Sequence, residues 1–411
     1  MLRTKTNLIQ PVGKNPSMST DTYINNSADV KTGLGPVSAS NAPLPVLLMA
    51  RELNFGGIER DVSKFARHLG NYGIAPHVAC FNPGGIRWRE IEAAGIPVLH
   101  VPVTSFKSRS ALTGARLVRD YIRKHNINVI HSFDDGSNIF NAVVGRMIGV
   151  PVVLASQLGA RKLSSLKNRV MTGIFVDRLA THAFVNCEAL ADELVKEWHV
   201  SRKGIHVCYN GFETDQFNPE NRTRPQRLQD ASVVIGTVAL LRPEKNLGVL
   251  IDAFAKVHLQ DPKARLLIVG SGPLKEELER RVRELQIAEA CIFEEATTTP
   301  ALWMRAIDVF VLPSRSEAFS NALLEAMACG CCPVGSRVGG MPELIRHGKH
   351  GFLFDPYNVD ELAEQLCRLT LNPALRNEMA AEAVRFAFEN LTIEVASQRL
   401  ASLYRELLGK C

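Results

Sequence analysis

Two acidic residues beside a strand-to-helix turn are the strongest candidates for chemistry in this sequence. Glu317 and Glu325 lie in the stretch PSRSEAFSNALLEAMACGCCPVGSRVGGMPELI, which begins after the apolar strand DVFVLP. A polar turn leads from that strand into a helix, and the free N–H groups and dipole of a helix N-terminus attract phosphate. The spacing puts Glu317 in the turn and Glu325 inside the helix, where both can face one pocket. The stretch therefore suits a diphosphate ligand.

Carboxylates beside a phosphate site suit the recognition of hydroxyl groups. A carboxylate is a strong bidentate acceptor for a vicinal diol, such as those of a sugar and of ribose. For Glu325 the alternative is a surface position that merely falls at helical spacing.

The stretch resembles the Glu-x7-Glu signature of the family 4 glycosyltransferases of the GT-B fold, and LLEAMACG and GGMPE, 339–343, resemble the family as well. The resemblance covers the chain from about Val46 onward. It implies that Glu317 contacts the donor sugar and that Glu325 holds the ribose. It also assigns the backbone of three residues to the sugar and diphosphate: Phe319, Ser320 and Asn321.

The segment LLRPEKN resembles the part of the family in which an arginine and a lysine clamp the donor diphosphate. Lys245 matches the lysine, whereas Leu240 stands where the arginine is expected and Arg242 is the nearby guanidinium. Losing one preorganised charge contact can cost roughly 3 kcal/mol of transition-state stabilisation. Two alternatives stay open: Arg242 substitutes for the arginine, or it is a solvated turn residue and the enzyme is slow.

Glycine turns follow two other expected strands. In NFGGIER, Gly56 and Gly57 lack a Cβ atom, so backbone N–H groups can approach a phosphate there; a plain turn before a helix is the alternative. Gly272 belongs to a GSGP loop that also resembles the family. A dinucleotide fingerprint would need glycine where Lys275 stands, so we do not expect NAD binding.

The segment HSFDD follows a strand of the first domain. Members of the family often show His-x-His here, with the second histidine facing the donor sugar, and this chain has Phe133 at that place. His131 is either a pocket residue with a catalytic role or a hydrogen-bonded histidine at a strand end. Asp134 and Asp135 either contact an acceptor hydroxyl or are exposed loop acids.

Short apolar runs alternate with amphipathic segments from Val46 onward, which predicts right-handed βαβ units and parallel sheets. The alternation restarts after a polar linker, so we expect an α/β fold of two doubly wound, Rossmann-like domains that face each other across a cleft. We expect five segments along the chain: a disordered tail at 1–45, an acceptor-binding domain at 46–212, a linker at 213–230, a nucleotide-sugar-binding domain at 231–385, and C-terminal helices at 386–411 that pack back toward the first domain.

Composition narrows the classes of protein. The 411 residues are 46% hydrophobic and 22% charged, as in soluble globular chains, and a net charge of +6 suits an anionic ligand or membrane surface. The nine cysteines form no paired framework and no complete zinc motif, which favours a reduced, cytoplasmic protein. No stretch approaches the roughly 20 apolar residues of a membrane span. We expect core thiols and no metal or cofactor.

The segment ARKLSSLKNRVM, 160–171, places basic residues among apolar ones. Such a stretch could rest on anionic lipid and present the cleft to a lipid-linked acceptor. A solvated helix face explains the same pattern. The residues concerned are Arg161, Lys162, Lys167 and Arg169 among Leu163, Leu166 and Val170.

Together, the motifs and the resemblance predict a retaining glycosyltransferase that moves a sugar from a UDP-, GDP- or ADP-sugar to a hydroxyl acceptor. The acceptor would be a saccharide or a lipid-linked molecule in polysaccharide, lipopolysaccharide or glycolipid synthesis, at the inner face of the membrane, with no nucleic acid involved. The alternatives are a catalytically impaired nucleotide-sugar-binding protein and a nucleotide-sugar epimerase or sugar phosphorylase on the same fold.

Overall fold

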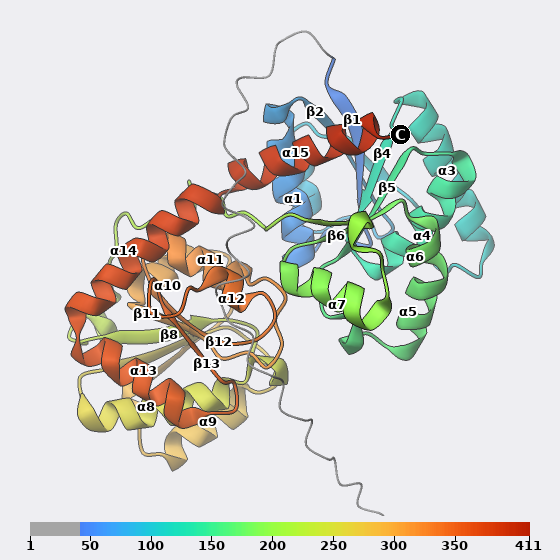
Figure 1. Ribbon diagram of the computed structural model, residues 1–411. Coiled ribbons are helices and arrows are strands. Elements are labelled where there is room, and N and C mark those ends of the chain that lie inside the picture. Colours follow the sequence, from blue (N-terminus) through green and yellow to red (C-terminus); the bar gives the residue numbers. More distant parts are fainter. Residues whose placement is uncertain (1–41) are drawn as a thin grey trace, which may run out of the picture. The chain divides into compact units, whose positions relative to one another are not determined.

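The computed structural model describes residues 42–411, which form two parallel β-sheets with helices on both faces (Figure 1). This arrangement confirms the predicted fold class. The predicted disordered tail lies outside the described residues up to residue 41. Leu44 and Pro45, which the sequence placed in that tail, belong to the first strand, because they extend its pairing with the neighbouring strand by two residues.

The first domain is built on seven parallel strands in the order β3-β2-β1-β4-β5-β6-β7. The central strands are buried on both faces and are continuous apolar runs, as expected for a sheet that helices cover on both sides. The strands are β1 (Leu44–Ala50), β2 (Ile74–Cys80), β3 (Val98–His100), β4 (Val129–Ser132), β5 (Val152–Gln157), β6 (His182–Val185) and β7 (Ile205–Val207). The helices are α1 (Gly57–Leu69), α2 (Ile86–Ala93), α3 (Arg109–Lys124), α4 (Asp135–Ile148), α5 (Leu166–Met171), α6 (Asp177–Leu179) and α7 (Glu188–Trp198).

The second domain has six parallel strands in the order β10-β9-β8-β11-β12-β13. They are β8 (Val234–Val238), β9 (Arg265–Val269), β10 (Cys291–Glu294), β11 (Val309–Leu312), β12 (Cys332–Ser336) and β13 (Phe352–Phe354). Its helices are α8 (Leu247–Gln260), α9 (Lys275–Glu284), α10 (Pro300–Ala306), α11 (Asn321–Ala328), α12 (Met341–Leu344), α13 (Val359–Leu371) and α14 (Pro373–Asn390).

The strand order reverses at one point in each sheet, between β1 and β4 in the first and between β8 and β11 in the second. Doubly wound sheets bind ligands at such points, outside the carboxyl ends of the strands. Most of the candidate residues follow one of these four strands. The fold therefore positions them where such sheets bind ligands.

The chain passes between the domains twice, and the two passages lie side by side. The Phe212 N–H donates to the Leu391 carbonyl at 3.1 Å, and the Ile393 N–H donates to the Phe212 carbonyl at 2.8 Å. After the second passage, α15 (Ile393–Gly409) packs on α1, with Leu400 and Tyr404 in the same core as Phe65 (Figure 1). The last helix thus belongs to the core of the first domain, whereas α14 packs on α11.

The predicted alternation of strands and helices is present in both domains. The strands β10 and β13 are short and lie at the two edges of the second sheet. Between α5 and α6 the chain forms one π-helical turn, Thr172–Val176.

Candidate active site

Lys245 and Glu317 lie together at the reversal point of the second sheet. Lys245 ends a short 3-10 turn after β8, and Glu317 lies in the loop after β11. The Lys245 ammonium is 2.7 Å from the Glu317 carboxylate, and the two side chains are 21% and 15% exposed. The structure thus brings together a cation and an acid that are 72 positions apart in the sequence.

The loop that carries Glu317 is supported by the two glycines of GGMPE. Gly339 has φ +49, and a Cβ atom there would lie 1.7 Å from the Glu317 carbonyl oxygen. The Gly340 N–H donates to the Ala318 carbonyl at 2.7 Å. Only residues without a side chain allow this approach. These glycines therefore help to set the shape of the acidic loop.

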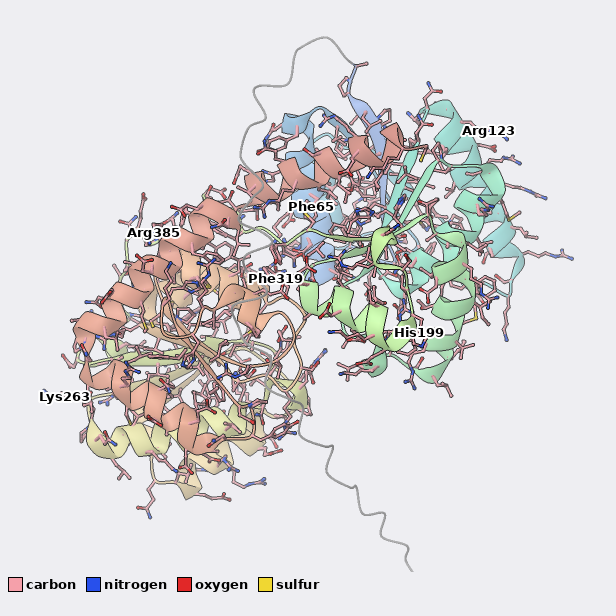
Figure 2. All side chains as sticks on the ribbon, in the orientation of Figure 1. Phe65, Arg123, His199, Lys263, Phe319 and Arg385 are labelled. Carbon is pink, nitrogen blue, oxygen red and sulfur yellow. The ribbon has the colours of Figure 1, made fainter. Side chains whose placement is uncertain are left out.

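The loop ends at the start of α11. Ser320 is the N-cap, and its hydroxyl accepts a hydrogen bond from the Leu323 N–H at 3.3 Å. Phe319, labelled in Figure 2, is buried and stacks on Tyr209 with ring centroids 5.1 Å apart. The Asn321 side chain is hydrogen-bonded to Asp61 and Asn210. The sequence did not predict these contacts with the first domain.

Glu325 lies one turn further along α11 and is buried. Its carboxylate forms an ion pair of 2.5 Å with Arg60 of α1. Burial raises the pKa of Glu325 above its ordinary value, while the positive charge of Arg60 opposes this effect. The alternative of a solvated surface position does not agree with this burial.

A cavity of about 440 Å³ lies beside Glu325 and is lined by both domains. Phe55 and Arg60 belong to the first-domain wall, and Thr297 and Thr298 to the loop after β10. The Phe55 side chain is 73% exposed. The lining of the cavity thus includes three carboxylates, four cationic side chains, two aromatic rings and two threonine hydroxyls.

The candidate glycines differ in their surroundings. Gly56 is the N-cap of α1 and has no side-chain cap; a Cβ atom there would lie 1.8 Å from the Glu59 carboxylate, the far end of a flexible side chain. Gly57 has open space around it. A Cβ atom on Gly272 would lie 2.5 Å from the Leu241 carbonyl oxygen. Gly272 therefore allows close packing against the segment that leads to Lys245.

Leu240 and Arg242 are both exposed. In the described part of the chain, the Arg242 guanidinium makes no ion pair, and Leu240 is 51% exposed at the place where an arginine was expected. The geometry thus agrees with a solvated turn residue at Arg242 and does not give it a partner in the site.

The structure does not support the catalytic role considered for His131, because this residue is buried. The His131 side chain is 0% exposed. Its Nδ1 lies 2.7 Å from the Tyr404 hydroxyl and its Nε2 lies 2.8 Å from the Ser156 hydroxyl, so both ring nitrogens are already hydrogen-bonded. Burial lowers the pKa of His131 to about 3. Phe133 stacks on it and is buried in the same core, so both rings are enclosed by protein.

Asp134 and Asp135 also have structural partners. Asp134 caps α4 in a capping box with Ser137 and accepts a hydrogen bond from the Arg51 N–H at 2.6 Å. Asp135 accepts one from the Asn168 side chain at 3.1 Å. These contacts do not assign either acid to an acceptor.

A carboxylate of the second domain caps a helix of the first. Glu343, from GGMPE, accepts hydrogen bonds from the N–H groups of Glu188 and Ala189, at 2.8 and 2.9 Å, at the start of α7. Burial raises the pKa of Glu343, and these two N–H groups oppose the shift. Sequence reasoning noted the motif but not this contact, because nothing in the sequence identifies its partner.

The basic segment 160–171 is only partly exposed. Arg161 is buried and forms a bidentate pair with Asp177 at 2.7 and 2.9 Å, so it is not available to a membrane. Three apolar side chains of the segment are exposed: Leu163 at 67%, Leu166 at 69% and Val170 at 50%.

Family comparisons match both domains of the chain. The profile described as "Glycosyltransferase Family 4" matches residues 55–216, and the one described as "Glycosyl transferases group 1" matches residues 219–386. A D-inositol 3-phosphate glycosyltransferase of Acidothermus cellulolyticus is 32% identical over 398 residues, which cover 86% of each chain. The chain belongs to the family 4 glycosyltransferases. It is therefore a glycosyltransferase of the GT-B fold, as the motif around Glu317 predicted.

Other relatives of this family 4 glycosyltransferase are more distant. The N-acetyl-alpha-D-glucosaminyl L-malate synthase of Bacillus anthracis is 25% identical over 307 residues, covering 72% of this chain and 78% of that protein. The structure of Anabaena Alr3699/HepE in complex with UDP has a TM-score of 0.77 at 20% identity, covering 88% of this chain and 100% of that one. A glycosyltransferase of Rickettsia africae has a TM-score of 0.79 at 18% identity, covering 90% and 100%. These structures share the fold.

Proposed function

We propose that this glycosyltransferase transfers a sugar from a nucleoside diphosphate sugar to a hydroxyl acceptor with retention of the anomeric configuration. The observation that carries the proposal is the contact of 2.7 Å between Lys245 and Glu317 beside the Ser320-capped start of α11. The ammonium and the helix N-terminus suit a diphosphate, and the carboxylate suits a sugar hydroxyl. Glu325 in the adjacent cavity would hold the ribose.

The proposed reaction needs no protein nucleophile. The bond between the anomeric carbon and the diphosphate oxygen breaks, and its electron pair leaves with the diphosphate. The acceptor oxygen attacks from the same face, and its proton passes to a departing phosphate oxygen. Lys245 and the α11 N-terminus stabilise the charge that develops on the leaving group.

The second domain would hold the donor and the first domain the acceptor. Alr3699/HepE has been solved with UDP and with UDP-glucose, so uridine nucleotides are the first donors to test, with GDP- and ADP-sugars as further candidates. The relatives' names include L-malate and D-inositol 3-phosphate, which are suitable acceptors for a first screen beside saccharides and lipid-linked acceptors. We propose that the reaction requires neither a metal nor a cofactor.

Release of the nucleoside diphosphate tests the proposal. Wild type and Glu317→Ala are compared with each sugar nucleotide, with and without EDTA, and the product's anomeric configuration is determined by NMR. We expect turnover that EDTA does not change, a retained configuration, and a loss of at least about 100-fold in Glu317→Ala. An inverted product would contradict retention, and donor binding without turnover would favour a binding protein instead.

We further propose that the exposed side chains of 160–171 contact an anionic membrane. No helix among the described residues is long and apolar enough to cross a membrane. Leu163, Leu166 and Val170 are exposed beside Lys162 and Lys167, a combination that suits an interfacial contact. Flotation with anionic and with zwitterionic vesicles tests this contact. We expect binding only to anionic vesicles, and its loss in Leu163→Ser/Leu166→Ser; no binding by the wild type would contradict it.

A further inference from the structure

The first domain holds the start of α11 through a carboxylate that the proposed donor site does not use. Asp61 on α1 accepts hydrogen bonds from the Asn321 side-chain amide, at 3.1 and 3.2 Å, and from the Asn210 amide at 3.0 Å. The Asn210 amide also donates to the Asn321 amide oxygen at 3.0 Å. Side chains from three separate segments thus form a closed ring of hydrogen bonds. Asn321 is the first residue of α11.

Asp61 is a charged residue in a buried position. It forms an ion pair of 2.8 Å with Lys64, and the two side chains are 6% and 3% exposed. The Lys64 ammonium also donates to the Gly211 carbonyl at 2.6 Å. A buried ion pair often stabilises a fold no better than apolar side chains of similar size, whereas leaving one of its charges unpaired is strongly unfavourable. Movements that separate Asp61 and Lys64 from each other or from their hydrogen-bond partners are therefore unfavourable.

The partners of this pair lie at both passages of the chain between the domains. A Cβ atom on Gly211 would lie 2.6 Å from the Thr392 carbonyl oxygen, so the first passage is packed tightly against the second. Asp61 and Lys64 thus connect α1 to the point where both passages meet. A change in the angle between the domains would have to alter these contacts.

The neighbouring residue of α1 contacts the same face of α11. Arg60 pairs with Glu325, which lies four residues after Asn321 and therefore on the same side of the helix. Two successive residues of α1 thus hold two successive turns of α11. This double contact fixes both the position and the rotation of α11.

We propose that Asp61 is a positioning residue that fixes α11, and with it the loop of Glu317, against the first domain. It acts through Asn321 and does not touch the substrate. The inference rests on the proposed function, in which the donor is held by the second domain and the acceptor by the first. Loss of Asp61 then misaligns the two substrates but leaves nucleotide binding intact.

Steady-state kinetics and UDP binding by calorimetry test this role in three variants. Asp61→Ala removes the acceptor of both amides, and Asn321→Asp places two carboxylates at hydrogen-bonding distance. We expect kcat to fall about 100-fold in each, as for a small misplacement of reacting groups, while the Kd for UDP stays unchanged in Asp61→Ala. Asp61→Asn/Asn321→Asp exchanges the amide and the carboxylate and should regain most of the wild-type kcat. Asp120→Ala, at an exposed acid of α3, is the control that should match the wild type.

The results separate positioning from a general structural role. Folded Asp61→Ala and Asn321→Asp proteins with wild-type kcat would overturn the inference, and so would a loss of UDP affinity with kcat unchanged. If Asp61→Ala does not fold, the comparison of Asn321→Asp with the exchange variant tests the role. A kcat that the exchange variant restores supports the role, and a kcat as low as that of Asn321→Asp overturns it. The proposed function is tested separately, with the wild-type protein and before any variant is compared. If the wild type turns over no sugar nucleotide, the proposed function itself is overturned.

Discussion

Arg60 of the first domain and Glu325 of the second form an ion pair of 2.5 Å at the wall of the cavity. A carboxylate has two oxygens and about four acceptor positions, so Glu325 can accept from Arg60 and from a ribose hydroxyl at the same time. The positive charge of Arg60 also favours the ionised form of a carboxyl whose pKa burial raises. The pair thus prepares Glu325 as a hydrogen-bond acceptor.

Glu325→Gln should weaken UDP binding about 10-fold or more, because hydrogen bonds to a charged group contribute about 1.5–3 kcal/mol. Calorimetry with UDP and with an analogue that lacks both ribose hydroxyls measures this effect. Wild type should prefer UDP, and the variant should bind the two ligands almost equally. Equal binding of both ligands by the wild type would show that Glu325 does not hold the ribose.

Leu240→Arg should raise kcat, because it supplies a second cation beside Lys245 for the leaving diphosphate. One such contact can change kcat by about 100-fold, so we expect a gain of about 10-fold or more. Leu240 is 51% exposed, so the longer side chain should not disturb the core, and Tm should stay close to that of the wild type. Leu259→Arg, at a leucine that is 84% exposed at the end of α8, is the control. Unchanged or lower kcat in Leu240→Arg would mean that this position does not face the diphosphate.

His131→Leu should lower the free energy of unfolding by about 1–3 kcal/mol, because it leaves the buried hydroxyls of Tyr404 and Ser156 without their partner. Urea denaturation measures this loss. The kcat of the folded variant should stay near the wild-type value, since His131 is fully buried. A large fall in kcat without a loss of stability would restore the catalytic interpretation.

Glu213→Gln should remove part of the acid sensitivity of the fold. Burial alone would raise the pKa of Glu213, but its contacts with His68 and Arg67 lower it from 4.5 to about 2. The unfolded chain therefore takes up the proton first as the pH falls. The stabilisation is complete above pH 4.5 and is lost as the pH falls toward 2, by on the order of 3 kcal/mol.

Urea denaturation at several pH values checks this dependence. The stability difference between wild type and Glu213→Gln should shrink as the pH falls below 4.5. Glu364→Gln, at an exposed acid of α13, should follow the wild type throughout. Parallel curves for wild type and Glu213→Gln would contradict the depressed pKa.

The meeting of the loops that carry Lys245 and Glu317 could be predicted because these loops follow two strands that are neighbours in the sheet. Lys245 comes after β8 and Glu317 after β11, and the alternation of apolar runs already placed both strands in one parallel sheet. Parallel strands present their carboxyl ends at one edge, so their loops meet. The contact between the two side chains follows from this topology.

Contacts between the domains could not be predicted in the same way. Asp61, Asn210 and Asn321 are distant in sequence, and an aspartate within an amphipathic helix carries no sign of a buried partner. The burial of His131 was missed for a related reason: the C-terminal helices were expected to pack toward the first domain, but the sequence does not show that the Tyr404 hydroxyl reaches His131. Such contacts depend on the relative placement of segments, which local periodicity does not encode.

The capping of α7 by Glu343 affects how the two halves of the molecule can open. If they separated at this point, the N–H groups of Glu188 and Ala189 would lose their acceptor, and the first turn of α7 would fray. The cavity beside the Thr297 loop is also bridged between the domains, by the ion pair of Arg60 and Glu325 at its wall. Separation of the two halves would thus break hydrogen bonds at α7 and an ion pair at the cavity, so we expect contacts at both places to resist it.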